Sequence, residues 1–205
     1  MKKVETTDMS AWPDEVSHLF IANHLANTHN ESCLSRLRQS QNRTYTCNAK
    51  DKGNIVVPEH VKIGETKNLK KVLRVCENAK VMITKNIDIG DKVVNGTLGV
   101  IVKIDRVRND RNGYPTGTIY VKCDDPESGR KLKDPRLRGE LKECIPIRPI
   151  VMEFKYKNVN VERYQFPLIL AHAMTTHKSQ GMSLDYFVGD LDRSAAQGRK
   201  GKSSC

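Results

Sequence analysis

The most informative stretch of this 205-residue chain is residues 167–185, which read PLILAHAMTTHKSQGMSLD. An apolar run at residues 168–171 leads into the polar cluster TTHKSQG at residues 175–181, and a second apolar run follows at residues 186–188. This order predicts a strand, a tight polar connection and another strand, the arrangement in which α/β sheets present functional residues at strand ends. Hydroxyl, imidazole, ammonium and amide groups so close together can bind phosphate oxygens. The alternative is a polar loop between two core strands that has no binding function.

A strand followed at once by a helix is predicted near the N-terminus. Residues 16–22 (VSHLFIA) are typical of a buried strand, and Asn23 stands where a helix N-cap is expected. Apolar or small residues then recur with helical spacing as far as Leu37. His29 and Cys33 lie one helical turn apart and could place two metal ligands on one face. Because no second pair lies nearby, a helix surface is the preferred interpretation.

The middle of the chain is rich in β-forming residues. Four short runs alternate with turn residues: 99–106, 117–122, 150–156 and 160–164. This spacing predicts a small, closed antiparallel barrel. Before it, residues 80–84 predict a strand and Asn95-Gly96 a tight turn. Residues 51–71 are expected to be a connecting loop with one short helix, and residues 127–141 a flexible charged loop.

Aromatic and basic residues in this middle part could contact nucleic acid if they are exposed. The aromatic candidates for base stacking are Tyr114, Phe154, Tyr156 and Tyr164, and the basic candidates for phosphate contact are Lys103, Arg106, Arg108 and Arg111. We expect core packing for most of the aromatic side chains and a solvated face for most of the charges.

Composition favours a polyanionic partner. The formal net charge is +11, and no basic amphipathic helix or long apolar stretch is visible, so nucleic acid fits better than a membrane. The six cysteines show no zinc-type spacing, and the N-terminus has no hydrophobic signal segment. We therefore expect reduced thiols in an intracellular protein.

Three stretches resemble one known family, the PIF-type ATP-dependent DNA helicases of superfamily one, subgroup B. Residues 171–185 match AxAxTxHKSQGxxLD, which is similar to motif V of that family. Residues 19–37 resemble its pattern LxxxNxxAxxxNxxxLxxL, and residues 81–100 resemble VMLxxNxD followed by xNGTxGxV. The resemblance covers about residues 16–191 and corresponds to only the C-terminal half of such a motor.

The resemblance implies an α/β fold: a partial RecA-like (P-loop NTPase-type) parallel-sheet domain with an inserted small antiparallel β-barrel. Residues 16–99 and 166–191 would form RecA-like domain 2A, and residues 100–165 the Src-homology-like barrel 2B. Residues 1–15 would be a disordered N-terminus and residues 192–205 a basic tail.

The resemblance also implies ATP-driven 5′–3′ unwinding of DNA, with roles in DNA repair, DNA recombination and telomere maintenance. In the family, this motif touches single-stranded DNA and couples it to the nucleotide cleft. Carried over to this chain, the DNA-binding residues are Thr176, His177, Lys178 and Ser179, and the nucleotide-coupling residues are Gln180 and Gly181. ATP and Mg²⁺ would serve the parent helicase. The partners would be single-stranded DNA and an N-terminal RecA-like domain, in cis or in trans, and no membrane would be involved. The resemblance implies a location in the nucleus or mitochondrion.

Motifs for phosphoryl transfer are missing from the sequence. It contains no complete Walker A loop or Walker B acid pair, and Arg193 and Arg199 do not stand in the family's arginine-finger context. Residues 196–203 (AQGRKGKS) fit a loose phosphate-loop pattern, but the sequence leaves no room for the helix that such a loop requires. We therefore predict no catalytic or metal-binding residue, no ATP binding by this chain alone, and inactivity in isolation. The alternative is a standalone, ATP-independent single-stranded nucleic-acid-binding module.

Overall fold

The computed structural model describes residues 17–40, 43–176, 179 and 187–190. Contacts divide the chain into two compact units, unit 1 with Met1–Cys33 and His172–Cys205, and unit 2 with Leu34–Ala171. The N-terminal segment and the basic tail that the sequence singled out lie outside the described residues. The expected boundaries between a RecA-like domain and an inserted barrel stay a prediction.

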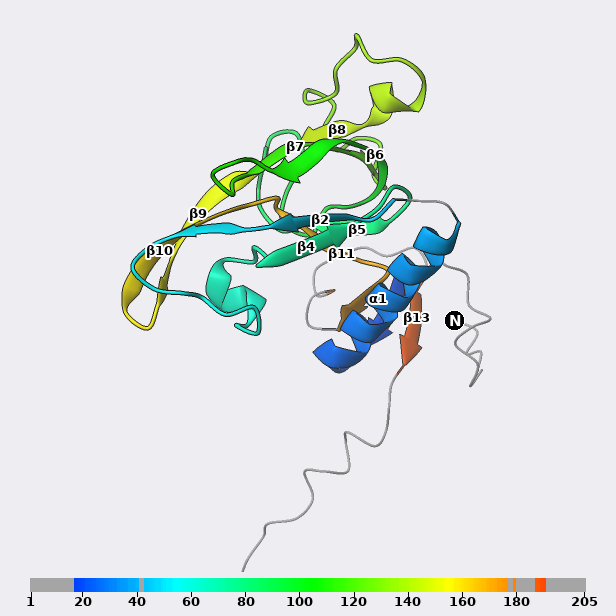
Figure 1. The fold of residues 1–205 in the computed structure, drawn as a ribbon. Helices are drawn as coiled ribbons and strands as arrows, with labels where there is room; N and C mark the ends of the chain where they lie inside the picture. The colour runs from blue at the N-terminus through cyan, green and yellow to red at the C-terminus, as the bar shows by residue number, and fades with distance from the viewer. Residues whose placement is uncertain (1–16, 41–42, 177–178, 180–186, 191–205) are drawn as a thin grey trace, which may run out of the picture. The chain divides into compact units, whose positions relative to one another are not determined.

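Unit 1 contains a small parallel sheet. Its strands are β1 (Ser17–Phe20), β12 (Ala173–Thr175) and β13 (Phe187–Asp190), in the order β12-β1-β13 (Figure 1). The central strand β1 pairs in parallel with both neighbours and is buried along its whole length, as is usual for parallel sheets. Together with the helix that follows β1, this sheet confirms the predicted α/β class.

Helix α1 (Asn23–Gln39) begins at the residue predicted to cap it. Its buried positions lie three, four, seven and eight residues apart, which is the apolar stripe of an amphipathic helix: Ala26, His29, Asn30, Cys33 and Leu34. The expected exposed pair of His29 and Cys33 is therefore wrong, because both side chains are buried. Two polar residues, His29 and Asn30, occupy the stripe where the pattern predicted only apolar or small ones.

Unit 2 consists of antiparallel β-structure. A five-stranded sheet has the order β11-β5-β6-β7-β8, formed by β11 (Leu168–Leu170), β5 (Lys80–Ile83), β6 (Leu98–Asn109), β7 (Pro115–Cys123) and β8 (Ile145–Ile147). A second sheet has the order β3-β10-β9, formed by β3 (Lys50–Lys52), β10 (Val159–Gln165) and β9 (Ile150–Tyr156). Strands β2 (Tyr45–Asn48) and β4 (Val72–Val75) pair separately, and η2 (Ile63–Thr66) and η3 (Gly139–Glu143) are short 3₁₀ turns.

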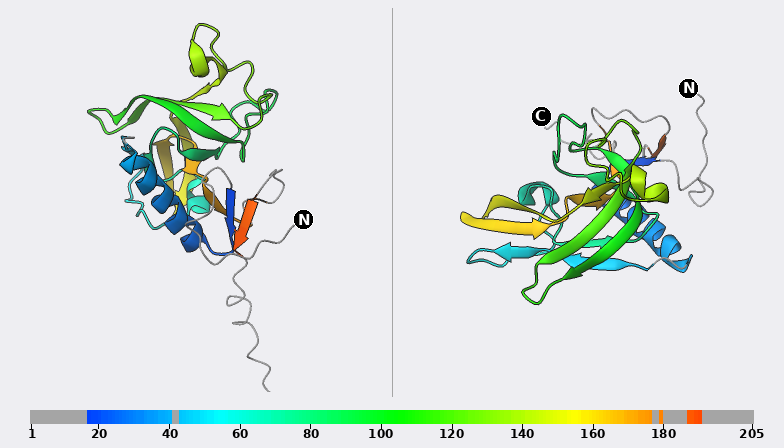
Figure 2. Two further views of the ribbon diagram at one scale, coloured as in Figure 1. Left: turned by 90° about the vertical axis from the view of Figure 1, so that its right-hand side faces the viewer. Right: turned by 90° about the horizontal axis from the view of Figure 1, so that it is seen from above.

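The strands predicted for the β-rich region are present as β6, β7, β9 and β10, and β6, β7 and β10 are longer than predicted. In both views of Figure 2, β6 and β7 form a long twisted hairpin. The predicted turn at Asn95-Gly96 is confirmed, since Thr97 N donates to Val94 O at 3.0 Å and Gly96 has a φ of 102°. Only glycine reaches this φ without strain.

The apolar run before the polar cluster forms two strands rather than the single one expected. Strand β11 pairs antiparallel with β5 in unit 2, whereas β12 pairs parallel with β1 in unit 1. The break lies at Ala171 and His172, both buried. No turn-forming residue marks this change of sheet, so the sequence pattern could not show it.

A buried ion pair holds the second sheet of unit 2 together. The side chain of Arg163 on β10 is 2% exposed and donates two hydrogen bonds to Asp51 on β3, at 2.7 and 2.9 Å. It donates a third to Leu69 O at 3.0 Å, and Lys71 Nζ binds the same carboxylate at 2.8 Å. Burial by itself would raise the pKa of Asp51, but the hydrogen bonds and charges of Arg163 and Lys71 outweigh it and lower the pKa.

The charged loop at residues 127–141 is anchored at its start. Asp91, which is 5% exposed, accepts hydrogen bonds from Lys131 N at 2.8 Å and Leu132 N at 3.3 Å. Its backbone oxygen accepts another from Gly129 N at 2.8 Å. A buried carboxylate that accepts several backbone hydrogen bonds holds the loop's backbone, so the expected flexibility does not apply to this part.

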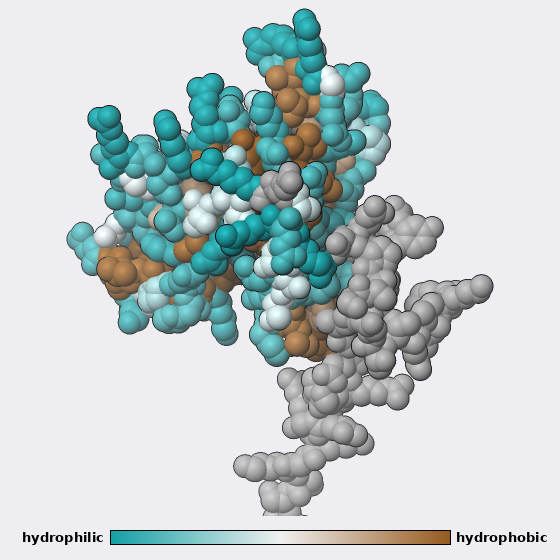
Figure 3. All heavy atoms as spheres, turned by 45° about the vertical axis from the view of Figure 1, so that its right-hand side comes forward, coloured by the Kyte–Doolittle hydropathy of each residue, from teal (hydrophilic) through white to brown (hydrophobic). Residues whose placement is uncertain are grey.

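The main apolar core of unit 2 lies between β4, β5, β6, β7 and β8, and its fully buried members include Leu73, Val81, Ile101 and Ile119. In the space-filling view, hydrophilic side chains cover most of the visible surface of the described residues (Figure 3). The five described cysteines are free thiols, and burial raises the pKa of Cys47 to about 11. No helix among the described residues is long and apolar enough to cross a membrane.

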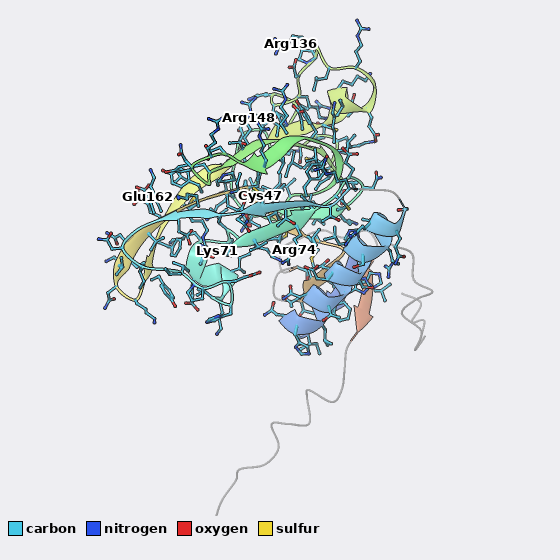
Figure 4. The ribbon with its side chains drawn as sticks, viewed as in Figure 1. Cys47, Lys71, Arg74, Arg136, Arg148 and Glu162 are labelled. Carbon is cyan, nitrogen blue, oxygen red and sulfur yellow. The ribbon has the colours of Figure 1, made fainter. Side chains whose placement is uncertain are left out.

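The buried ion pair of Arg163 predicts a large effect on stability. Arg163→Met should lower the free energy of unfolding by about 3 kcal/mol or more, because Asp51 then keeps its charge in a buried site with only Lys71 beside it. Chemical denaturation monitored by circular dichroism measures this change. Arg136→Met is the matched control, because Arg136 also makes a bidentate pair, with Asp134 at 2.9 Å, but its side chain is 88% exposed (Figure 4). Equal losses in both variants would contradict this account of burial.

Candidate nucleic-acid interface

The carboxyl ends of all three strands of unit 1 lie level with one another. Phe20, the last residue of β1, is in register with Thr175, the last residue of β12, and with Asp190, the last residue of β13. In open α/β sheets, ligands bind outside the carboxyl ends of the strands. The polar cluster identified in the sequence begins at Thr175, so it leaves the sheet at this edge.

The backbone turns directly after β12. Thr176 N donates to Phe20 O at 3.1 Å, which ties the first residue beyond the strand to the end of β1. Ser179 N donates to Thr175 O at 3.1 Å, and Ser179 Oγ donates to Thr176 O at 3.0 Å. These bonds fix a single turn whose two ends are Thr175, which is buried, and Ser179, which is half-buried.

Asn30 clamps β12 from helix α1. Its side-chain amide donates to Ala173 O and its side-chain oxygen accepts from Ala173 N, both at 2.8 Å. Asn30 is 7% exposed, so both bonds are made away from solvent. The Asn30 side chain thus binds the N–H and C=O of Ala173 as the backbone of a neighbouring strand would, and it fixes β12 two residues before Thr175. Asn30 is a positioning residue that the sequence interpretation missed, although a polar asparagine on the buried stripe of a helix was the signal for it.

Aromatic rings pack behind the clamp. The rings of His18 and His29 have centroids 4.2 Å apart, and His29 lies 5.6 Å from the ring of Phe20. His18 N also donates to His172 O at 3.0 Å, just before β12 begins. The contacts of β1 with α1 and β12 therefore combine the apolar cluster of Phe20, Ala26 and Ala173 with ring packing and backbone hydrogen bonds. His29 lies in this core rather than on a surface.

Of the six residues carried over from the helicase motif, the structure describes two. Thr176 and Ser179 are half-buried and lie in the turn after β12. His177, Lys178, Gln180 and Gly181 lie outside the described residues, so their assignment stays a prediction.

The aromatic candidates of unit 2 are engaged in packing. Phe154 is buried in a small apolar cluster, and Tyr156 packs against that cluster. Tyr114 and Tyr164 meet edge to face at 5.0 Å, with Lys52 Nζ 5.5 Å from the first ring centroid and 5.0 Å from the second. The hydroxyls of Tyr114 and Tyr164 raise the pKa of Lys52. Because Lys52 already lies over both rings, we assign this cluster to structure.

The structure bears on metal binding only through the residues that it describes. Among them, no group of three or more His, Cys, Asp or Glu side chains is placed to hold a metal ion. Thr176, which is half-buried, offers a neutral hydroxyl group, which suits a hydrogen bond to a phosphate oxygen but does not neutralise charge.

Comparison with known proteins finds similarity to DNA helicases. The chain is 32% identical over 118 residues to the ATP-dependent DNA helicase PIF1 of Xenopus laevis, a match that covers 57% of the chain. The chain is similar in sequence to Pif1 helicases over part of its length. The match spans only 15% of the length of the Xenopus protein. No family model matches the chain.

Solved Pif1 structures share the fold. The crystal structure of the Candida albicans Pif1 helicase is similar with a TM-score of 0.61 at 24% identity, over 87% of this chain and 39% of that one. The structure of Bacteroides Pif1 bound to single-stranded DNA is similar with a TM-score of 0.54 at 21% identity, over 87% of this chain and 35% of that one. The predicted resemblance to PIF-type helicases is thus confirmed in sequence and in fold.

The Asn30 clamp predicts a specific loss of stability. Asn30→Ala should lower the free energy of unfolding by about 2 kcal/mol, because it leaves the N–H and C=O of Ala173 buried without their partner. Asn30→Asp should also destabilise, because a carboxylate accepts from Ala173 N but repels Ala173 O. Asn27→Ala, at an exposed position on the same helix, is the control and should have little effect. Denaturant unfolding measures all three, and similar values for Asn27→Ala and Asn30→Ala would refute the clamp.

Proposed function

We propose that this chain supplies the second RecA-like domain of an ATP-dependent 5′–3′ DNA helicase and contacts single-stranded DNA at the carboxyl edge of the β12-β1-β13 sheet. The observation that supports the proposal is the register of Phe20, Thr175 and Asp190, because Thr175 begins the polar cluster and ends its strand at the edge where α/β sheets bind ligands. Its second support is the similarity to Pif1 helicases, one of which has been solved with bound single-stranded DNA.

In this proposal, Thr176, His177, Lys178 and Ser179 face the DNA backbone. Ser179 Oγ donates its proton to Thr176 O within the turn, so Ser179 would hold the shape of the turn rather than donate to a phosphate oxygen. Lys178 supplies the positive charge, and the imidazole of His177 supplies a hydrogen bond. Contacts of this kind position a strand without reading its sequence, as a translocating motor requires.

Gln180 and Gly181 would couple the DNA to a nucleotide cleft that a partner RecA-like domain completes. Phosphoryl transfer needs a phosphate loop, a metal-holding acid and an arginine together. The sequence has no matching set, so ATP and Mg²⁺ would act in the whole motor and the isolated chain would be inactive. We propose roles in DNA repair, DNA recombination and telomere maintenance, in the nucleus or mitochondrion.

A second function is a standalone single-stranded nucleic-acid-binding module that works without ATP. The formal net charge of +11, together with the missing phosphate-loop motifs, favours it. The two functions share the same DNA contacts but differ in whether a partner domain restores ATP hydrolysis.

The proposed DNA contact predicts the behaviour of Lys178→Ala. This variant should weaken binding to a fluorescent oligo-dT and reduce the slope of log affinity against log salt by about 0.7, the value for one lost phosphate contact on a single strand. Fluorescence anisotropy over a salt series measures the slope. Lys62→Ala is the control, because Lys62 is exposed in unit 2. An unchanged slope for Lys178→Ala would remove the assignment.

The requirement for a partner domain predicts the ATPase behaviour. The purified chain alone should show no DNA-stimulated ATP hydrolysis in a coupled phosphate-release assay. Addition of the N-terminal RecA-like domain of a Pif1 helicase, in trans or as a fusion, should restore hydrolysis if the chain is half of a motor. DNA-stimulated hydrolysis by the chain alone would contradict the proposal. Tight binding to oligo-dT with no rescue by the added domain would favour the standalone module.

A further inference from the structure

One face of unit 2 gathers exposed cations on three adjacent strands. We call it the basic ribbon face, and it consists of Lys103, Arg106 and Arg108 on β6, Lys122 on β7, and Arg148 just after β8, all of them exposed. Figure 4 labels Arg148 beside β7 and β8. Three of these residues were named as phosphate contacts from the sequence, whereas the fourth residue named there, Arg111, lies in the turn beyond β6.

Strand register explains why most of these cations share a face; Arg106 lies within a register shift and is placed there by its exposure. Lys103 pairs with Tyr120, and Arg108 pairs with Thr116. Every second residue of a strand faces the same side, and on β7 these residues are Thr116, Thr118, Tyr120 and Lys122. On β8, Pro146 pairs with Tyr120, which places Arg148, two residues further on, on that side as well. Asp105 pairs with Thr118 and lies on that side too, so hydroxyl groups and one carboxylate lie between the cations.

The opposite face of the same strands is the core of unit 2, so the orientation of the cations is fixed. Ile101, Ile104 and Val107 of β6 are buried, with 0%, 5% and 7% of their surface exposed. Turning the strand over would expose these three apolar side chains and bury the charges. The burial of the apolar residues thus holds Lys103, Arg106 and Arg108 toward solvent.

Two irregularities in β6 create this arrangement. The register shifts between Ile101 and Lys103, and again between Asp105 and Arg108. At the second shift, Arg106 adopts a left-handed φ of 51°, and a Cβ on Gly117 opposite would lie 2.6 Å from the Arg106 backbone. An arginine in the left-handed region is strained where glycine would not be, and such strain is found at functional sites.

The face keeps a net positive charge. Asp105 lies 3.6 Å from Arg106, and Glu140 binds Lys122 at 3.0 Å. Among the described residues, no carboxylate forms a salt bridge with Lys103, Arg108 or Arg148. These three cations are therefore available to an external anion.

We propose that the basic ribbon face binds the sugar–phosphate backbone of nucleic acid without sequence preference, as a second surface in addition to the helicase-like motif. The inference goes beyond the proposed function, because its residues lie in unit 2 and none belongs to the motif. A protein partner is a poorer fit, since protein interfaces have an apolar or aromatic centre. The exposed large apolar side chains of the described residues are Ile21, Val56, Ile87, Ile89 and Val151, and none of them lies on β6, β7 or β8. The same absence disfavours insertion into a membrane.

The test uses the full chain with the variant Lys103→Gln, Arg106→Asn, Arg108→Gln, in which asparagine tolerates the left-handed backbone. Fluorescence anisotropy between about 50 and about 200 mM salt should show a salt slope smaller by about 2 on single-stranded oligo-dT, or by about 2.7 on a duplex, for three lost phosphate contacts. Comparison of the slope changes on single-stranded and duplex DNA shows which form of DNA the face binds.

The matched control removes three exposed cations from other elements, Lys62→Gln, Arg74→Gln and Lys155→Gln. It carries the same change in net charge and should leave the slope nearly unchanged. Equal losses in the two triple variants would overturn the proposal, because they would show that only net charge matters. An unchanged slope on both DNA forms would overturn it as well.

The failure of this inference is distinguishable from the failure of the proposed function. A smaller salt slope in Lys178→Ala with an unchanged slope in the ribbon variant would refute the ribbon face and leave the helicase assignment standing. A smaller slope in the ribbon variant with an unchanged slope in Lys178→Ala would refute the DNA contact of the motif and leave the ribbon face standing. If the triple variant does not fold by circular dichroism, Lys103→Gln and Arg108→Gln are measured singly, each with an expected loss of about 0.7. Anionic phosphatidylserine vesicles form the last arm. Reduced vesicle binding with unchanged DNA binding would refute the proposal.

Discussion

The ion pair of Arg163 with Asp51 is the constraint on which unit 2 depends. A buried guanidinium needs a carboxylate and further acceptors in fixed places, and here they come from β3 and from Leu69 O. Two residues along β10, Gln165 donates to Cys47 O at 3.0 Å and to Lys70 O at 3.3 Å. A shift of β10 by one residue would break all of these bonds. The strand that leads through Phe166 toward β11 is thereby held in one register.

Much of the fold can be predicted from local sequence patterns. The helical spacing of apolar residues predicts α1, and runs of apolar or β-forming residues bounded by turn residues predict β1, β5, β6, β7, β9 and β10. The division of residues 168–175 between two sheets was not predicted, because buried strands on both sides of His172 carry similar apolar residues. The bulges of β6 were also missed, since they depend on how β7 pairs and not on the composition of β6 itself.

The candidate site also has a part that the sequence predicts and a part that it does not. The polar cluster after β12 could be found from the sequence, because so many polar groups between two apolar runs have no role in packing. Its support could not be found. Asn30 binds Ala173 across 143 positions of sequence, and the backbone of Thr176 binds that of Phe20. Local patterns carry no information about such distant pairs, except for the oddity of an asparagine on a buried helix stripe.

The two proposed surfaces would hold nucleic acid by different physics. Hydrogen bonds from the turn after β12 act over about 3 Å and depend on direction, so they need the exact placement that the Asn30 clamp and the backbone of Phe20 provide. The charges of the basic ribbon face act over about a Debye length, roughly 10 Å at 0.1 M salt, and tolerate small displacements. For the basic ribbon face, it is sufficient that the core residues of the sheet fix the side on which the cations lie. The turn after β12 also needs buried polar partners, and Asn30 of α1 is such a partner in unit 1.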